Sequence, residues 1–307
     1  MSVSLDINKG KKLAELLYSS FSTVGIHGQT EMPEDEIPEG IERGSLEHIL
    51  FITLTVSIDY MRDAHALWES ARKTFEDPKT RYLFEPKLLA EVHYKKIVDD
   101  MKKYNLAKRP NKDSLIWKTV STTFENKWNS NPLNFLDNCD WNSLTILECL
   151  KNDNHKLENK KVHDFPHLRG PKIGPLWIRM LRDNVGISKI KNLDKISIPI
   201  DIHIARSSLA TGVVYGEFNG KLNDLFEHIG KAWFESVNGL KINGRDMIAL
   251  DVDEPLWHLS KYGCTHRDKL TGECPVFDKC EAKEFCINGK LTITKGRVIM
   301  ETWNHGL

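Results

Sequence analysis

Residues 46–75 read LEHILFITLTVSIDYMRDAHALWESARKTF, and apolar residues recur in this stretch at intervals of three and four. Because an α-helix completes one turn in about 3.6 residues, this spacing places the apolar residues on one face of a helix. Residues 85–104 and 112–128 repeat the pattern. Runs that alternate between apolar and polar residues, as strands do, are scarce before residue 290. The sequence therefore predicts a mostly α-helical fold.

The composition is that of a folded protein with a large apolar core. The chain has 307 residues, of which 40% are hydrophobic, and this suits one large domain or two ordinary ones. No apolar run approaches the roughly 20 residues of a membrane helix. The N-terminal residues MSVSLDINKGKKLAELL lack the long apolar segment and cleavage site of a signal peptide. These features predict a cytoplasmic protein with no membrane partner.

The charges balance, with 43 Lys and Arg residues against 43 Asp and Glu residues. Many nucleic-acid-binding proteins have a strong basic excess, so any basic surface here must be local. Residues 93–113 hold such a concentration of cations: Lys95, Lys96, Lys102, Lys103, Lys108, Arg109 and Lys112. Two interpretations fit this stretch, namely a solvated helix face followed by a basic loop, or a contact with phosphates.

The sequence also predicts a loop before the first long helix and a hairpin near the C-terminus. Residues 30–44, TEMPEDEIPEGIERG, contain two prolines and a group of acids, and we interpret them as a simple connection. Ser45 is expected to cap the helix that follows. Near the C-terminus, residues 290–303 predict a hairpin that turns at Lys295 and Gly296.

Four of the six cysteines lie within residues 264–286, CTHRDKLTGECPVFDKCEAKEFC. In a reducing cytosol, clustered cysteines are more often metal ligands than disulfides. Cys139 and Cys149 lie far upstream among apolar residues at helical spacing, and we expect them to pack in the core.

A glycine- and proline-rich turn opens another helix within residues 165–186, FPHLRGPKIGPLWIRMLRDNVG. Pro175 is tolerated in the first turn of that helix, where its missing N–H costs little. Main-chain N–H groups at the start of a helix suit a phosphate. Taken alone, the turn is better explained as a plain connection.

Asp201 begins a predicted helix in residues 196–214, ISIPIDIHIARSSLATGVV. An aspartate in this position caps a helix without any further role. His203 and Arg206 follow at helical spacing and are compatible with surface or structural positions.

Taken in order, these segments resemble the helix-hairpin-helix DNA glycosylases related to endonuclease III. That family has a glycine-rich hairpin, an apolar-Asp-x-His-x-x-Arg segment and a four-cysteine loop, and the resemblance covers residues 45–286. Residues 170–186 are similar to the hairpin and following helix of archaeal oxoguanine glycosylases. Residues 101–115 resemble the loop and helix that enter the DNA near the damaged base.

The resemblance implies a role for each of several residues. Asp201 would be the catalytic acid–base and electrostatic residue. Gly170, Lys172 and Gly174 would bind the DNA backbone in the hairpin. Lys103 and Lys108 would contact DNA from the basic stretch.

Two alignments leave the role of Lys172 open. If Gly170-Pro171-Lys172 matches the family's glycine-x-lysine, Lys172 is the Schiff-base nucleophile of an enzyme that also cuts the strand. If Leu168-Arg169-Gly170 matches the hairpin instead, Gly174 takes the lysine's position and the enzyme only removes the base. Pro175 favours the second alignment, because in the first it would remove a hydrogen bond inside the helix.

The resemblance also implies that Cys264, Cys274, Cys280 and Cys286 hold a [4Fe-4S] cluster. Only the last gap, of five residues, agrees with the family's usual spacing. The cluster tolerates wider loops than one zinc ion, which commonly uses closely paired cysteines. Zinc stays as the alternative, with His258 or His266 replacing a ligand. The loop would turn Lys261, His266, Arg267 and Lys269 toward DNA.

The resulting prediction is a two-lobed helix-hairpin-helix fold. Residues 46–188 form a helical lobe with the hairpin, and residues 1–45 with 189–307 form the cluster-bearing lobe. The predicted activity is removal of a damaged or mismatched base from double-stranded DNA by a monomer, with or without strand cleavage. In a prokaryote the protein would associate with the nucleoid. A non-catalytic DNA-binding relative and a zinc-stabilised interaction protein are the alternatives.

Overall fold

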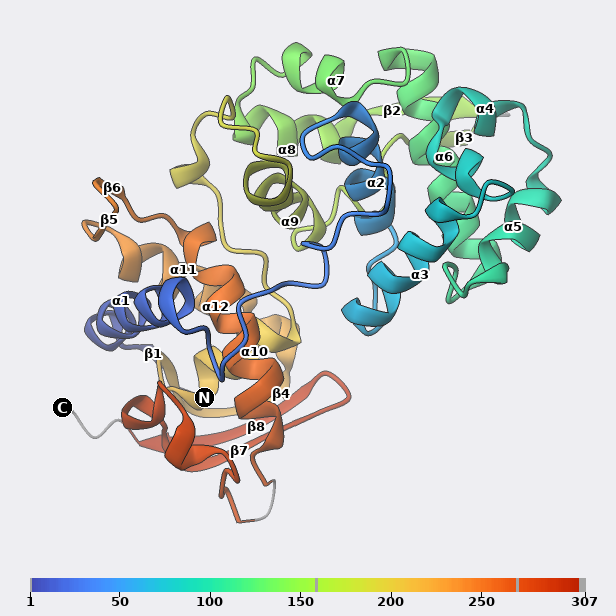
Figure 1. Ribbon diagram of the computed structural model, residues 1–307. Coiled ribbons are helices and arrows are strands. Elements are labelled where there is room, and N and C mark those ends of the chain that lie inside the picture. The colour runs from blue at the N-terminus through green and yellow to red at the C-terminus, as the bar shows by residue number, and fades with distance from the viewer. Residues whose placement is uncertain (1, 158–159, 269–270, 304–307) are drawn as a thin grey trace. The chain divides into compact units, whose positions relative to one another are not determined.

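A computed structural model describes residues 2–157, 160–268 and 271–303. It is mostly helical, as predicted, with a small sheet (Figure 1). Among the described residues, no helix is both long and apolar enough to cross a lipid bilayer.

The chain divides into two compact units, which we call unit 1 and unit 2. Unit 1 comprises Met1–Glu31 and Ile196–Leu307, and unit 2 comprises Met32–Lys195. Unit 2 is therefore longer at both ends than the predicted lobe of residues 46–188. At its C-terminal end, Lys191 N–H donates to the Trp141 carbonyl over 2.7 Å, and Ser143 N–H donates to the Lys191 carbonyl over 3.1 Å. These bonds fasten residues 189–195 to unit 2.

Helices of unit 2 form in all three stretches with apolar periodicity, although residues 46–75 form two helices separated by residues 57–63. Ser45 caps the first of them, accepting from His48 N–H over 3.2 Å. That helix, α2, is buried along nearly all of its length and contacts α3, α6, α7 and α9. The elements are α2 (Leu46–Val56), α3 (Ala64–Glu76), α4 (Pro86–Glu91), α5 (Tyr94–Lys103), α6 (Pro110–Trp128), α7 (Pro132–Asn138), α8 (Ser143–Asn152), β2 (Asn154–Leu157), β3 (Lys160–His163) and α9 (Ile173–Met180).

The acidic loop is more than the simple connection that we expected. Glu34 is 3% exposed and accepts a hydrogen bond from Arg179, which is fully buried in α9. Burial raises the pKa of Glu34, and the Arg179 guanidinium opposes that rise. Asp35 accepts from Asn184 Nδ2 over 2.6 Å. The interpretation as a simple connection was wrong because two of the loop's carboxylates anchor it to α9 and the turn that follows.

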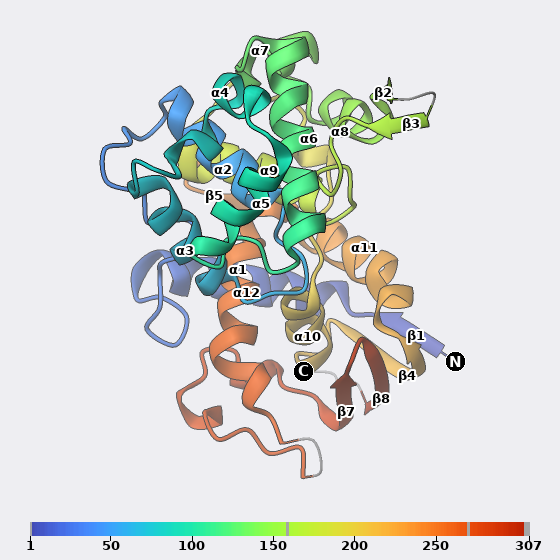
Figure 2. The same cartoon turned by 90° about the vertical axis from the view of Figure 1, so that its right-hand side faces the viewer.

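Unit 1 contains a four-stranded antiparallel sheet in the order β1-β4-β8-β7. Helices α10 and α11 pack on this sheet, and α1 and α12 pack against these helices (Figures 1 and 2). The elements are β1 (Ser2–Leu5), α1 (Ile7–Thr23), α10 (Ile202–Ala210), β4 (Val214–Lys221), α11 (Phe226–Val237), β5 (Lys241–Ile242), β6 (Arg245–Asp246), α12 (Asp253–His258), β7 (Asn288–Thr294) and β8 (Arg297–Trp303).

The sheet confirms one prediction and corrects another. Strands β7 and β8 form the predicted hairpin, with Thr294 paired to Arg297 across the turn. Strand β4 was missed, since two glycines interrupt its apolar pattern. Gly216 is required there: its φ is 122°, and a Cβ would lie 2.1 Å from the Ser2 carbonyl oxygen. The glycine that obscures the strand in the sequence allows β1 to approach β4.

The buried Arg179–Glu34 pair provides a stability test. Arg179→Met leaves the Glu34 carboxylate buried without its cation, so we expect unit 2 to lose about 3–5 kcal/mol of unfolding free energy. The measurement is urea unfolding followed by tryptophan fluorescence and circular dichroism. Lys73→Met is the matched control, because Lys73 and Glu69 form an exposed pair. Equal effects of the two substitutions would contradict this account of the acidic loop.

Candidate functional site

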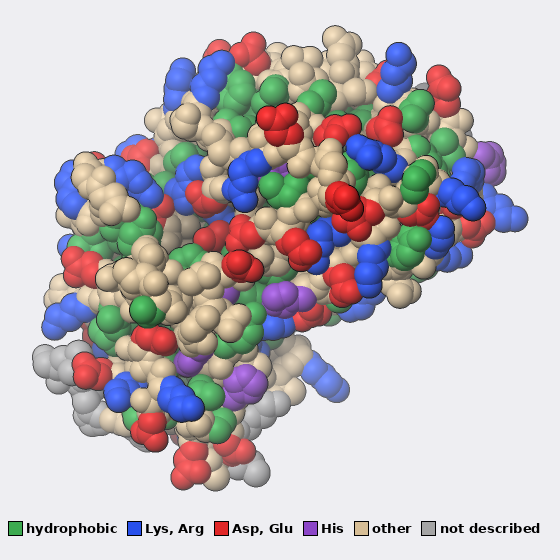
Figure 3. All heavy atoms as spheres, viewed as in Figure 1, with side chains coloured by type: hydrophobic (Ala, Val, Ile, Leu, Met, Phe, Trp, Pro, Cys, Tyr) green, Lys and Arg blue, Asp and Glu red, His purple; other side chains and the backbone are tan. Residues whose placement is uncertain are grey.

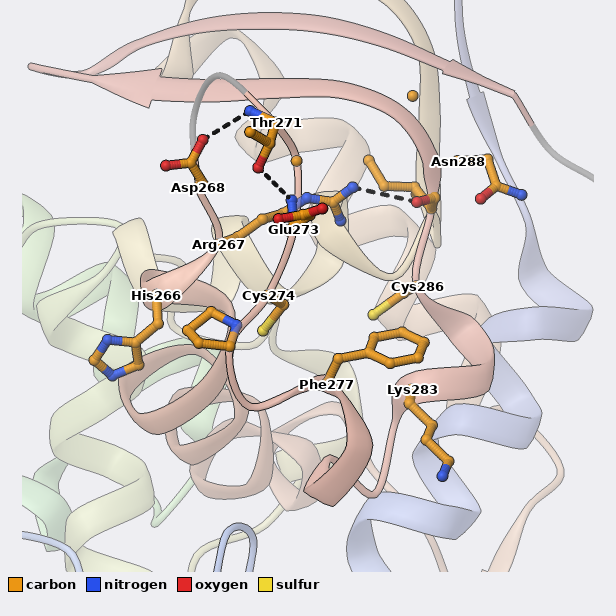
Figure 4. Close-up of a pocket in the computed structure, with 14 residues that line it drawn as sticks. His266, Arg267, Asp268, Thr271, Glu273, Cys274, Phe277, Lys283, Cys286 and Asn288 are labelled. Atoms are coloured by element: carbon orange, nitrogen blue, oxygen red, sulfur yellow. Dashed lines mark hydrogen bonds between the residues drawn. The ribbon is translucent and has the colours of Figure 1, made fainter.

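The four clustered cysteines come together in unit 1. Cys264, Cys274, Cys280 and Cys286 all line one small pocket, together with Ala210, Gly263, Arg267 and Phe277. In Figure 4 the Cys286 sulfur lies beside the ring of Phe277, and Cys274 lies across the pocket from it. All four are free thiols. The fold thus brings to one pocket the four cysteines that the sequence distributes over 23 residues.

Electrostatics in this pocket disfavour thiolates when no cation is present. Burial raises the pKa of Cys264, and the other three thiols raise it further. Burial also raises the pKa of Cys280 to about 12 and the pKa of Cys286 above its usual value. Since metals bind the thiolate, a cation in the pocket would reverse this balance.

Basic side chains surround the cysteines. Arg206 lowers the pKa of Cys264, and Arg267 and Lys9 lower the pKa of Cys286, although burial outweighs each of them. Four thiolates bring more negative charge than a zinc ion or a [4Fe-4S] core can neutralise, so nearby cations stabilise either complex. The donor set and its charge therefore fit a metal centre.

The sequence predicted that His258 or His266 could replace a cysteine as a zinc ligand, and that His266 and Arg267 face DNA. The structure gives no support for these positions. His258 is fully buried and packs its ring 5.1 Å from Phe21 rather than lining the cysteine pocket. The His266 ring turns away from Cys274 and Cys286 in Figure 4. Arg267 lines the pocket and donates to the Ile287 carbonyl over 3.3 Å, so it faces the cysteines. Lys269 lies outside the described residues.

Asp201 caps helix α10. Its Oδ1 accepts from His203 N–H over 2.7 Å and from Ile204 N–H over 3.0 Å. One turn further along the helix, Arg206 donates to Thr265 Oγ1 over 2.9 Å and to Ser260 Oγ over 3.3 Å. Thr265 follows Cys264 directly. Helix α10 therefore carries Asp201 at its start and contacts the beginning of the cysteine loop.

In unit 2, the predicted hairpin is a compact turn whose glycine amides are already hydrogen-bonded. Gly170 N–H donates to the His167 carbonyl over 2.8 Å, and Gly174 N–H donates to the Gly170 carbonyl over 3.1 Å. A Cβ on Gly174 would lie 2.8 Å from Leu147. The glycines thus close the turn and pack it tightly, and their two amides do not point outward to a phosphate.

Lys172 ends this turn and immediately precedes α9. Its Nζ lies 3.1 Å from Asp59 Oδ2, and Asp59 follows the end of α2. Because α9 begins at Ile173, Pro175 lies in its first turn. This placement agrees with the alignment in which Gly174 takes the lysine's position.

A cationic and aromatic cluster surrounds Tyr60 in unit 2. The Arg109 guanidinium lies 4.9 Å from the Tyr60 ring centroid and Lys112 lies 5.8 Å from it. The His167 ring, from the glycine-rich turn, lies 5.3 Å away. Lys108 donates to the Met61 carbonyl. We call these residues the Tyr60 cluster.

Exposure and charge make the Tyr60 cluster a candidate nucleic-acid interface. Tyr60 is 47% exposed and Met61 is 77% exposed. Burial lowers the pKa of His167, and Arg109 and Lys112 lower it further. On the face of the molecule shown in Figure 3, Lys and Arg side chains are interspersed with Asp and Glu. The basic character is local, as the balanced composition required.

Lys103, predicted to contact DNA, lies at the end of α5 and forms an ion pair with Asp77. That pairing lowers the pKa of Asp77 to about 2. The sequence stretch that held seven cations therefore separates into four lysines on α5 and a second group, Lys108, Arg109 and Lys112, near Tyr60. Three of the α5 lysines, Lys96, Lys102 and Lys103, form ion pairs on the described surface. In the second group, Arg109 pairs with the buried Asp113.

Sequence reasoning missed Lys9 and the Tyr60–His167 contact. Lys9 is separated from Cys286 by most of the chain, and nothing in its surroundings signals a metal centre. Cys139 is fully buried as predicted, whereas Cys149 is partly exposed.

No protein-family model matches this chain, and no curated protein matches it significantly.

The pocket predicts which cysteines retain metal. Cys264→Ser and Cys274→Ser should each lose most of the bound metal, because each removes one ligand from a four-thiol site. Cys139→Ser and Cys149→Ser are the controls, and both should retain the wild-type metal content. The measurement is iron, zinc and acid-labile sulfide per chain after anaerobic purification. Equal retention by all four variants would contradict the assignment.

Proposed function

We propose that this protein is a DNA glycosylase that removes a damaged or mismatched base, with a [4Fe-4S] cluster held by the four clustered cysteines. The observation that carries the proposal is the combination on α10: Asp201 caps its start, and Arg206 contacts Thr265 beside Cys264. An acidic residue at a helix start, joined to a four-cysteine loop by the same helix, is the arrangement that the sequence resemblance implies.

Asp201 suits the chemistry of base removal. The N–H groups at the start of α10 stabilise a carboxylate there, and both of the hydrogen bonds described above go to one oxygen, Oδ1. A carboxylate accepts a proton from the attacking water and stabilises the positive charge that develops on the sugar. The water oxygen bonds to C1′ as the bond from C1′ to the base breaks, and Asp201 takes the proton that the water loses. The base leaves with the electron pair of the broken bond and takes a proton from solvent.

DNA binding would use the Tyr60 cluster. Lys108, Arg109 and Lys112 supply cations for backbone phosphates, which fix a protein on DNA without reading its sequence. The exposed Tyr60 and Met61 side chains offer apolar surface to a base that has lost its stacking partner. These residues replace the glycine amides as the proposed DNA contacts in unit 2.

Asp201→Asn separates catalysis from folding. Asparagine caps a helix as well as aspartate does, so the variant should fold while base release falls by at least about 100-fold, the lower range for loss of a general base. The assay is single-turnover release from a panel of duplexes, each containing one damaged or mismatched base. Asp6→Asn is the matched control, because Asp6 caps α1 in the same unit.

Unchanged base release by Asp201→Asn would remove Asp201 from the mechanism. Duplex binding without any base release, by the wild type and the variant alike, would instead support a non-catalytic DNA-binding relative.

Lys172 is not expected to form a Schiff base. Its ion pair with Asp59 and the position of Pro175 favour the alignment without a nucleophilic lysine. Borohydride treatment of the protein on DNA with an abasic site should therefore give no covalent adduct. An adduct that forms with the wild type and disappears in Lys172→Ala would contradict this and make the enzyme bifunctional.

A further inference from the structure

His27 lies beside the metal pocket although it is separated from the cysteine loop by most of the chain. It follows α1, within a tight turn closed by hydrogen bonds between Ile26 and Gln29. Its main-chain N–H donates to Glu281 Oε1 over 3.1 Å. Glu281 is the residue after Cys280. This bond fixes the turn to the part of the loop that contains a proposed ligand.

The imidazole of His27 is close to the Cys280 sulfur. A ring nitrogen of His27, the Cys280 Sγ and a carboxylate oxygen of Glu281 all lie within 4.8 Å of one another. The His27 Nε2 is buried and has no hydrogen-bond partner among the described residues. A buried polar nitrogen without a partner is costly and needs an explanation.

Gly263 makes room for this ring. A Cβ at position 263 would lie 2.5 Å from His27 Nε2. Gly263 also lines the four-cysteine pocket and precedes Cys264. The edge of the imidazole therefore reaches the chain segment that forms the wall of the metal site.

We infer that His27 donates an N–H hydrogen bond to the Cys280 sulfur and thereby raises the reduction potential of the cluster. The inference rests on the metal centre of the proposed function. Hydrogen bonds to cluster sulfurs stabilise the more negative, reduced state, and partners outside the ligand set commonly tune metal sites in this way.

The role is that of a donor outside the ligand set. Four cysteines line the pocket and His27 does not, so in the proposed cluster the four thiolates would be the ligands and His27 would lie outside that set. Glu281 Oε1 accepts from the His27 main chain, and this bond positions the turn that carries the ring.

Two substitutions at position 27 test the inference. Gln places an amide N–H near the position of Nε2, whereas Leu removes the donor and keeps similar bulk. His27 has a φ of 50°, and both replacements meet the same backbone cost, so their comparison isolates the donor. His228→Leu is the control, because His228 is exposed in the same unit.

The measurement is the reduction potential of the anaerobically purified protein by film voltammetry, with iron content determined on the same samples. We expect His27→Leu to lower the potential by an amount equivalent to about a tenfold change in the one-electron equilibrium constant, about 59 mV. His27→Gln should stay near the wild-type value, and His228→Leu should have no effect. All variants should retain the wild-type iron content.

Several results would overturn the inference. Equal potentials for the wild type and His27→Leu would show that the ring does not act on the cluster. Loss of iron in both position-27 variants would make His27 a ligand instead of a donor. Protein that contains zinc or no metal would remove the cluster on which the inference depends. An intact cluster with the expected shift but no base release would uphold the inference and contradict only the glycosylase proposal.

Discussion

The meeting of four thiols around one pocket is the constraint on which the cysteine loop of unit 1 depends. Burial and mutual repulsion raise the pKa values of Cys264, Cys280 and Cys286, so the pocket favours neutral thiols until a cation enters it. The surrounding elements hold the loop in place. The Ile287 N–H donates to the Ala210 carbonyl over 2.9 Å, which joins the end of the loop to the end of α10. Strand β7 then begins at Asn288.

The same connections link the metal pocket to Asp201. Helix α10 begins with the Asp201 cap, contacts the start of the cysteine loop through Arg206 and meets its end at Ala210. A cluster that orders the loop would therefore also stabilise the helix that presents the carboxylate. This gives the cluster a structural role in the proposed chemistry that does not require electron transfer.

Local sequence patterns predicted the features that depend on local physics. Apolar periodicity located the helices, Ser45 was recognised as a cap, and the 290–303 hairpin followed from its turn residues. Long-range partners were not predictable. Nothing in TEMPEDEIPEGIERG distinguishes Glu34 from its acidic neighbours, because its burial depends on Arg179 far along the chain. Strand β4 escaped because Gly216 carries no strand signal and is explained only by the approach of β1.

In the candidate site, too, local features were predictable from the sequence and long-range contacts were not. The clustering of four cysteines within 23 residues predicted that they share one site, since local turns of a short loop are enough to bring them together. The glycine-rich turn suggested outward-facing amides, whereas Gly170 and Gly174 use theirs within the turn. An isolated sequence pattern cannot show which main-chain N–H groups form hydrogen bonds within the turn and which stay available to a ligand. The Tyr60 cluster likewise depends on contacts between the loop after α2, the start of α6 and His167 that only the fold creates.

The most direct test of this account is the iron, acid-labile sulfide and visible absorption of the wild-type protein purified without oxygen. The account predicts about four irons and four sulfides per chain, the composition of a [4Fe-4S] cluster, with a broad absorption band that gives a brown colour. One zinc per chain and a colourless protein would contradict it, and would favour a zinc-stabilised interaction protein.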